Sequence, residues 1–157
     1  MTPSLSPGTL RSAVDLFAKV RRDAELLMQE VTSDRVFNFT VTAYSLIDWI
    51  RNDPAVPERA KQQSEIEKLR SDPWLKLCGD LATSAKHFEL TTRKPTASEV
   101  TAQQGYGMGR FGKGGWGVGE EQITIHLPDG SAHDVLELVE GSQRTWGSFF
   151  ALHGITI

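Results

Sequence analysis

The stretch of sequence that decides the fold is residues 72–90, DPWLKLCGDLATSAKHFEL. Asp72 can cap a helix, and Pro73 suits the first helical position because the N–H that proline lacks has no partner there. Apolar residues then recur at spacings of three and four, which places them on one helix face: Trp74, Leu77, Cys78, Leu81, Ala85 and Phe88. The pattern predicts an amphipathic helix, with helices before it and strands after it.

Three more helices are predicted on the N-terminal side of this stretch. Apolar spacings of three and four indicate helices over about residues 9–32 and 33–53, and a less apolar helix begins at Pro57. Short links join them, so residues 9–90 predict an antiparallel four-helix bundle. Residues 1–8 contain two prolines and a glycine and predict a flexible tail.

The pattern on the C-terminal side is that of strands. Residues 99–104 alternate weakly, residues 121–127 alternate cleanly, and Pro128-Asp129-Gly130 is typical of a hairpin turn before a return strand over 131–139. Residues 91–140 therefore predict a three-stranded antiparallel β meander, too small to fold without the helices. A short C-terminal helix over 142–153 follows, capped by Ser142 and ended by Gly154. The predicted fold is α+β, with residues 1–157 as one domain.

Composition limits the function classes. A chain of 157 residues with 39% hydrophobic residues and a net charge of −3 predicts a folded domain without a general preference for nucleic acid. Cys78 is the single cysteine, which excludes an internal disulfide framework and predicts a reducing, cytoplasmic location. No run of about 18 apolar residues exists, so we expect no membrane partner.

A glycine-rich loop over residues 105–119 contains eight glycines. Its Gly107-x-Gly109-x-x-Gly112 matches a phosphate-loop pattern, but a strand follows instead of a helix, so we predict no nucleotide cofactor. Cations and aromatic residues alternate between the glycines: Arg110, Phe111, Lys113 and Trp116. Such side chains bind nucleic acid by charge and stacking, and they also anchor protein interfaces. The loop is therefore a candidate partner-binding site, for either class of partner.

Two polar clusters are weaker candidates. Asp80 and His87 lie on one face of the predicted helix, about 10.5 Å apart along its axis, with Lys86 adjacent. They could serve acid–base chemistry, or they form a polar helix edge packed beside the meander. His126 and His133 flank the hairpin turn and could share a metal ion, but no third ligand accompanies them, so no metal site is predicted.

Residues Phe37–Leu90, with the segment Cys78–Phe88, resemble short uncharacterised bacterial and phage proteins in which a Lys-His pair ends a helix before a glycine-rich β segment. The bundle also loosely resembles the HEPN class of helical ribonucleases. That class carries an Arg about five residues before a His, a spacing that no Arg–His pair has here.

Two functional interpretations follow. The first is a non-catalytic intracellular binding or regulatory protein that contacts its partner through the glycine-rich loop. The alternative, implied by the resemblance, is a HEPN-like ribonuclease or toxin-like protein with a rearranged site around His87, Asp80 and Lys86.

Overall fold

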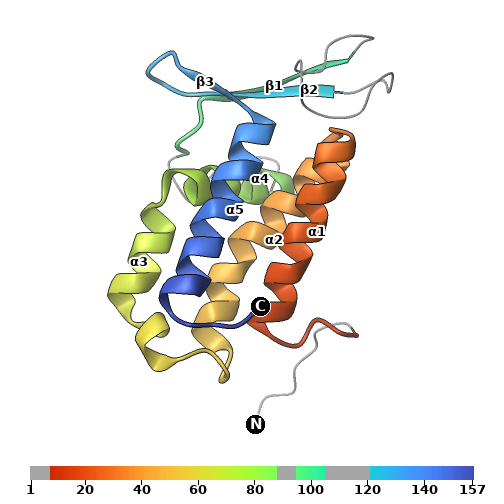
Figure 1. The fold of residues 1–157 in the computed structure, drawn as a ribbon. Coiled ribbons are helices and arrows are strands. Elements are labelled where there is room, and N and C mark those ends of the chain that lie inside the picture. Colours follow the sequence, from red (N-terminus) through yellow and green to blue (C-terminus); the bar gives the residue numbers. More distant parts are fainter. Residues whose placement is uncertain (1–7, 88–94, 105–120) are drawn as a thin grey trace.

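The computed structural model describes residues 8–87, 95–104 and 121–157, and this part of the chain has an α+β fold (Figure 1). A three-stranded sheet lies across one end of a group of helices. In chain order the elements are α1 (Ala13–Gln29), α2 (Ser33–Asn52), the 3-10 helix η1 (Glu58–Lys61), α3 (Gln63–Ser71), α4 (Pro73–His87), β1 (Glu99–Gln104), β2 (Glu121–His126), β3 (Ala132–Asp134) and α5 (Val135–Leu152).

Side-chain caps fix where the first helices begin. The α1 helix starts after Ser12 rather than near residue 9, because the Ser12 hydroxyl accepts the N–H of Asp15 while the Asp15 carboxylate accepts the N–H of Ser12. The α4 helix starts as predicted, with the Asp72 carboxylate accepting the N–H groups of Trp74 and Leu75, each at 3.0 Å. The helix predicted from Pro57 is divided into η1 and α3.

The arrangement of the helices differs from a simple bundle. The helices α1, α2 and α5 run side by side, while α4 crosses them beneath the sheet (Figure 1). The antiparallel four-helix bundle predicted for residues 9–90 is therefore not confirmed in that form. One cluster of buried side chains joins the helices to β2, with Trp146, Phe39 and Phe150 among its largest fully buried members.

The C-terminal helix is present, but its predicted start at residue 142 is wrong, because α5 begins at Val135. Its first turn is capped by the Asp134 carboxylate, which accepts the N–H of Leu136 at 2.8 Å. The predicted return strand over 131–139 shrinks to β3. Ser142, predicted as a cap, lies buried in the middle of α5. The apolar side chains of 135–139 face the core with helical spacing, while Gly154 follows the helix with a φ of +64°, as predicted.

The sheet confirms the predicted antiparallel meander, in the order β1-β2-β3. Six pairs join β1 to β2, from Glu99 opposite His126 to Gln104 opposite Glu121. The turn before β3 has Gly130 at a φ of +86°, a conformation that glycine adopts without strain.

The start of β2 is fastened to the link between α1 and α2. The N–H of Glu121 donates to the carbonyl of Val31 at 3.1 Å, and the Glu121 carboxylate accepts the N–H of Ser33 at 2.7 Å. These bonds hold the first residue of β2 against the link between α1 and α2.

Candidate binding pocket

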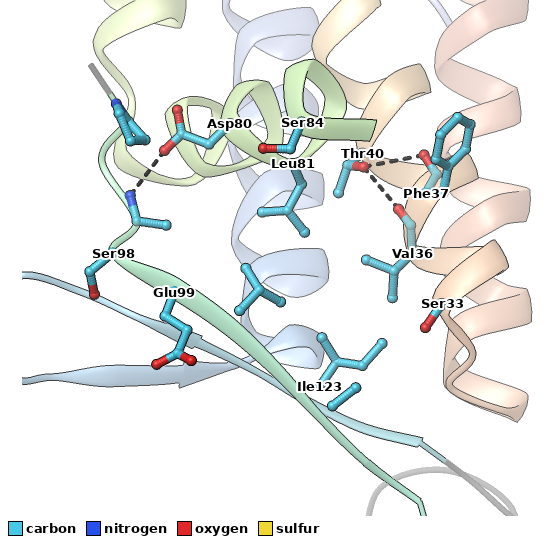
Figure 2. A pocket seen from close by; sticks show the side chains of 14 residues that line it. Ser33, Val36, Phe37, Thr40, Asp80, Leu81, Ser84, Ser98, Glu99 and Ile123 are labelled. Atoms are coloured by element: carbon cyan, nitrogen blue, oxygen red, sulfur yellow. Dashed lines mark hydrogen bonds between the residues drawn. The ribbon is translucent and has the colours of Figure 1, made fainter. Parts of the chain in front are cut away.

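A pocket of about 460 Å³ lies between the sheet and the two helices α2 and α4 (Figure 2). The helical side contributes Ser33, Val36, Phe37, Thr40, Asp80, Leu81 and Ser84. The sheet side contributes Pro95, Ala97, Ser98, Glu99, Val100, Ala102 and Ile123. The volume is within the range of about 300–1,000 Å³ that is typical of ligand sites.

The pocket exists because the helices cover β2 but leave β1 uncovered. Val100 pairs with Ile125 and Ala102 pairs with Ile123, so all four side chains share one face of the sheet. The two isoleucines are 0% and 4% exposed, whereas Val100 is 46% exposed and Ala102 is also exposed. The inner face of β1 is thus an apolar surface without a complete covering.

The helical wall of the pocket is apolar as well. Phe37 on α2 is 46% exposed, although it is large and aromatic. Leu81 on α4 is half-buried and points from α4 toward β1 in Figure 2. The Thr40 hydroxyl donates to the carbonyl groups of Val36 and Phe37, at 2.9 and 3.2 Å, and so satisfies its own polar group within α2.

Asp80 lies at the end of the pocket where the chain enters the sheet. Its side chain is buried, and one carboxylate oxygen accepts the N–H groups of Thr96 and Ala97, at 2.6 and 3.0 Å (Figure 2 draws one of these bonds). Asp80 therefore fastens the segment before β1 to α4. This contact matches the expectation of a polar helix edge packed beside the meander.

The other two members of the predicted acid–base cluster, Lys86 and His87, are the last two residues of α4. The structure describes the backbone of these two residues, whereas their side chains lie outside the described part of the structure. Among the described residues that line the pocket, Asp80 and Glu99 are the ionisable ones, and both are acids.

His126 and His133 point to opposite faces of the sheet. His133 pairs with Ile125, whose side chain is in the core, while His126 is the next residue along β2. The His126 ring meets the Thr101 hydroxyl at 3.0 Å, and the His133 ring meets the Glu137 carboxylate at 3.0 Å. The two imidazoles therefore cannot share a metal ion. Within the described ranges no cluster of three potential metal ligands exists.

The thiol of Cys78 is fully enclosed, with its sulfur 3.3 Å from the Ser142 hydroxyl oxygen. Burial raises the pKa of the Cys78 thiol to about 12. The thiolate that a nucleophile requires is therefore absent near neutral pH.

The loop residues predicted to bind a partner, Arg110, Phe111, Lys113 and Trp116, lie outside the described residues. The pocket itself was missed by sequence reasoning. Its signal was the alternation of Val100 and Ala102 with polar residues in 99–104, which indicates one apolar strand face. The sequence does not say whether a helix covers that face.

The comparisons with known proteins give no relative. No protein-family model matches the chain, and neither a curated protein nor a solved structure is significantly similar to it. In the described part of the chain, no helix is both long and apolar enough to cross a membrane.

Proposed function

We propose that this protein is a non-catalytic, cytoplasmic binding protein, and that its partner occupies the region formed by the pocket and the glycine-rich loop 105–119. The observation that carries this proposal is the apolar pocket with two large exposed hydrophobic side chains, Phe37 and Val100. Exposed apolar patches next to a hollow are typical of interaction sites.

Two further observations support binding rather than catalysis. The Asp80 carboxylate holds two backbone N–H groups, which is a structural task, and the Cys78 thiol is buried and protonated. The ionisable groups among the described lining residues are the two acids Asp80 and Glu99, and that described lining contains no histidine, lysine, arginine or cysteine. A described lining of this kind can recognise an apolar partner, and the Asp80 carboxylate in it is already engaged by the backbone N–H groups of Thr96 and Ala97.

The connectivity of the sheet links the loop to two strands that line the pocket. The loop joins the end of β1 to the start of β2. Ala102 and Ile123, a paired couple close to those two ends, both line the pocket. A partner held by the cations and aromatic rings of the loop would therefore meet the pocket with its adjoining surface.

The proposal is tested with the triple variant Arg110→Ala, Lys113→Ala, Trp116→Ala. A partner is recovered from the native host, identified and purified, and its Kd is measured for both proteins. We expect binding to weaken by at least about tenfold, or ~1.4 kcal/mol. A matched control replaces Arg21 and Arg22, exposed on α1, by alanine and should leave the Kd unchanged. An unchanged Kd for the triple variant would contradict the role of the loop.

Salt dependence and a cleavage assay separate the remaining alternatives. A nucleic-acid partner would lose affinity steeply with rising salt, because bound cations displace counterions, while a protein partner would give a shallow slope. The HEPN-like ribonuclease alternative predicts that the purified protein cleaves RNA and that His87→Ala abolishes cleavage. That pair of results would overturn the non-catalytic proposal.

A further inference from the structure

Within the part of the chain that the structure describes, the strand β1 is an edge strand of the sheet. Among the described residues it pairs with β2 alone, so the backbone groups on its other side have no strand beside them. The opposite edge, β3, is only three residues long and continues directly into α5. An exposed strand edge is a template for a further strand from another chain.

The pocket lies along this open edge. Consecutive residues from Ala97 to Val100 line it, and Ala102 extends it further along β1. Side chains of consecutive strand residues point to opposite faces, as Figure 2 shows for Glu99. A pocket touched by both Glu99 and Val100 therefore reaches the edge of the strand as well as its inner face.

Three of the devices that protect an edge strand are missing from the residues of β1 itself. Residues Glu99–Gln104 contain no lysine and no proline, and their six pairs with β2 run without a bulge. Glu99 supplies the single charge, at the start of the strand. The edge is thus able to pair along its whole length, about 20 Å at roughly 3.3 Å per residue.

We propose that the pocket receives an extended peptide segment of a partner protein, which adds to the sheet as a fourth strand beside β1. Backbone hydrogen bonds to β1 give affinity, while alternate apolar side chains of the peptide enter the pocket against Val100, Leu81 and Phe37. This inference rests on the proposed binding function and assigns the partner to the protein class.

The charges of the pocket define the peptide further. Glu99, which is exposed, is the ionisable residue that β1 itself contributes to the described lining. A peptide with an acidic residue at this position would meet like charge. The peptide is therefore apolar at alternate positions, and neutral or basic where it passes Glu99.

The test uses a random library of peptides of about ten residues, selected against the full chain. The tightest peptide is then resynthesised with a single N-methyl group on each amide in turn. A methyl group removes one N–H, so binding should weaken by about tenfold or more at every second position, where the N–H faces β1. A period of three to four would indicate a bound helix and would overturn the proposal, as would a library without a specific binder.

Two lysine substitutions on β1 provide a matched pair. Ala102→Lys places a charge on the pocket side, and Gln103→Lys places the same charge on the adjacent, opposite-facing position; both residues are exposed. We expect Ala102→Lys to weaken the selected peptide by about tenfold or more and Gln103→Lys by less than about twofold. Phe37→Ala, which leaves β1 intact, should also weaken binding and covers the case in which Ala102→Lys disturbs the sheet.

The outcomes separate this inference from the function on which it rests. One outcome is that the loop triple variant no longer binds the host partner, while the Ala102→Lys and Phe37→Ala variants bind both the host partner and the library peptide as tightly as the wild type. In that case the strand-addition inference fails and the binding function stands. If the chain dimerises in sedimentation and Ala102→Lys abolishes the dimer, a second copy occupies the edge, which overturns the proposed peptide partner. If small apolar molecules bind the pocket while every N-methylated peptide retains affinity, the proposal is likewise overturned.

Discussion

At the scale of single residues, Gly141 on α5 is fixed by its contact with Trp74. A Cβ at position 141 would lie 2.5 Å from three atoms of the Trp74 ring system. We expect Gly141→Ala to lower the free energy of unfolding by about 1–2 kcal/mol, because overpacking outweighs the gain in helix propensity. Gly147, on the same helix, has no heavy atom within 4 Å of a Cβ placed there. Gly147→Ala should therefore stabilise by about 0.5–1 kcal/mol. Urea unfolding measures both, and equal effects would contradict this packing.

The buried Cys78 thiol predicts a loss of stability at alkaline pH. Its pKa is raised to about 12 by burial, from an ordinary value of 9.0, so the unfolded chain releases its proton first as pH rises. The stabilisation is complete below about pH 9 and falls between pH 9 and 12, by up to ~1.4 kcal/mol per pH unit. Unfolding of the wild type and of Cys78→Ala across this range checks the prediction, because the difference isolates the thiol. A parallel pH dependence of the two proteins would contradict it.

Residue-level predictions from the sequence succeeded where a local pattern was sufficient. Asp72 and Gly130 have the backbone roles that their sequence neighbours indicated. Asp80 was predicted only as a member of a polar stripe, because its partners, the N–H groups of Thr96 and Ala97, lie 16 and 17 residues away. Such a partner depends on how the chain returns after α4, which local spacing does not encode.

At the scale of elements, α4 separates core from pocket along its length. Leu75 is fully buried, whereas Leu81 is half-buried and lines the pocket. We expect Leu75→Ala to cost about 2–5 kcal/mol of unfolding free energy, the usual range for a buried cavity. Leu81→Ala should cost at least ~1 kcal/mol less, because part of its surface is already in water. Equal losses in urea unfolding would show that the pocket is closed in solution.

The start of α5 shows why an element can be assigned to the wrong class. Residues 135–139, Val-Leu-Glu-Leu-Val, form a short apolar run that fits either a strand or a helix. The helix is favoured because the Asp134 carboxylate caps its first turn. It also buries Val135, Leu138 and Val139 on one face. Burial depends on packing against the other helices, so the sequence window alone left this element ambiguous.

At the scale of the whole molecule, the sheet and the helices share one core. Ile125 of β2 and Phe150 of α5 are both fully buried in the same cluster. We expect the two elements to unfold together, so native-state hydrogen exchange of their amides should give opening free energies equal within about 1 kcal/mol. A sheet that opens more easily by about 2 kcal/mol or more would indicate a separate cooperative unit and would contradict the single-domain prediction.

The long-range contacts of α5 form only late in the synthesis of the chain. The Trp146 indole N–H donates to the carbonyl of Ala43 at 3.0 Å, across 103 residues, and the ring of Phe150 stacks on that of Phe17 at 4.5 Å. Synthesis proceeds from the N-terminus, so α1 and α2 leave the ribosome long before α5 can cover them. During that interval the apolar side chains of α1 and α2 that α5 covers in the folded protein lack this cover, so we expect a nascent chain that stops before residue 146 to aggregate more readily than the full chain.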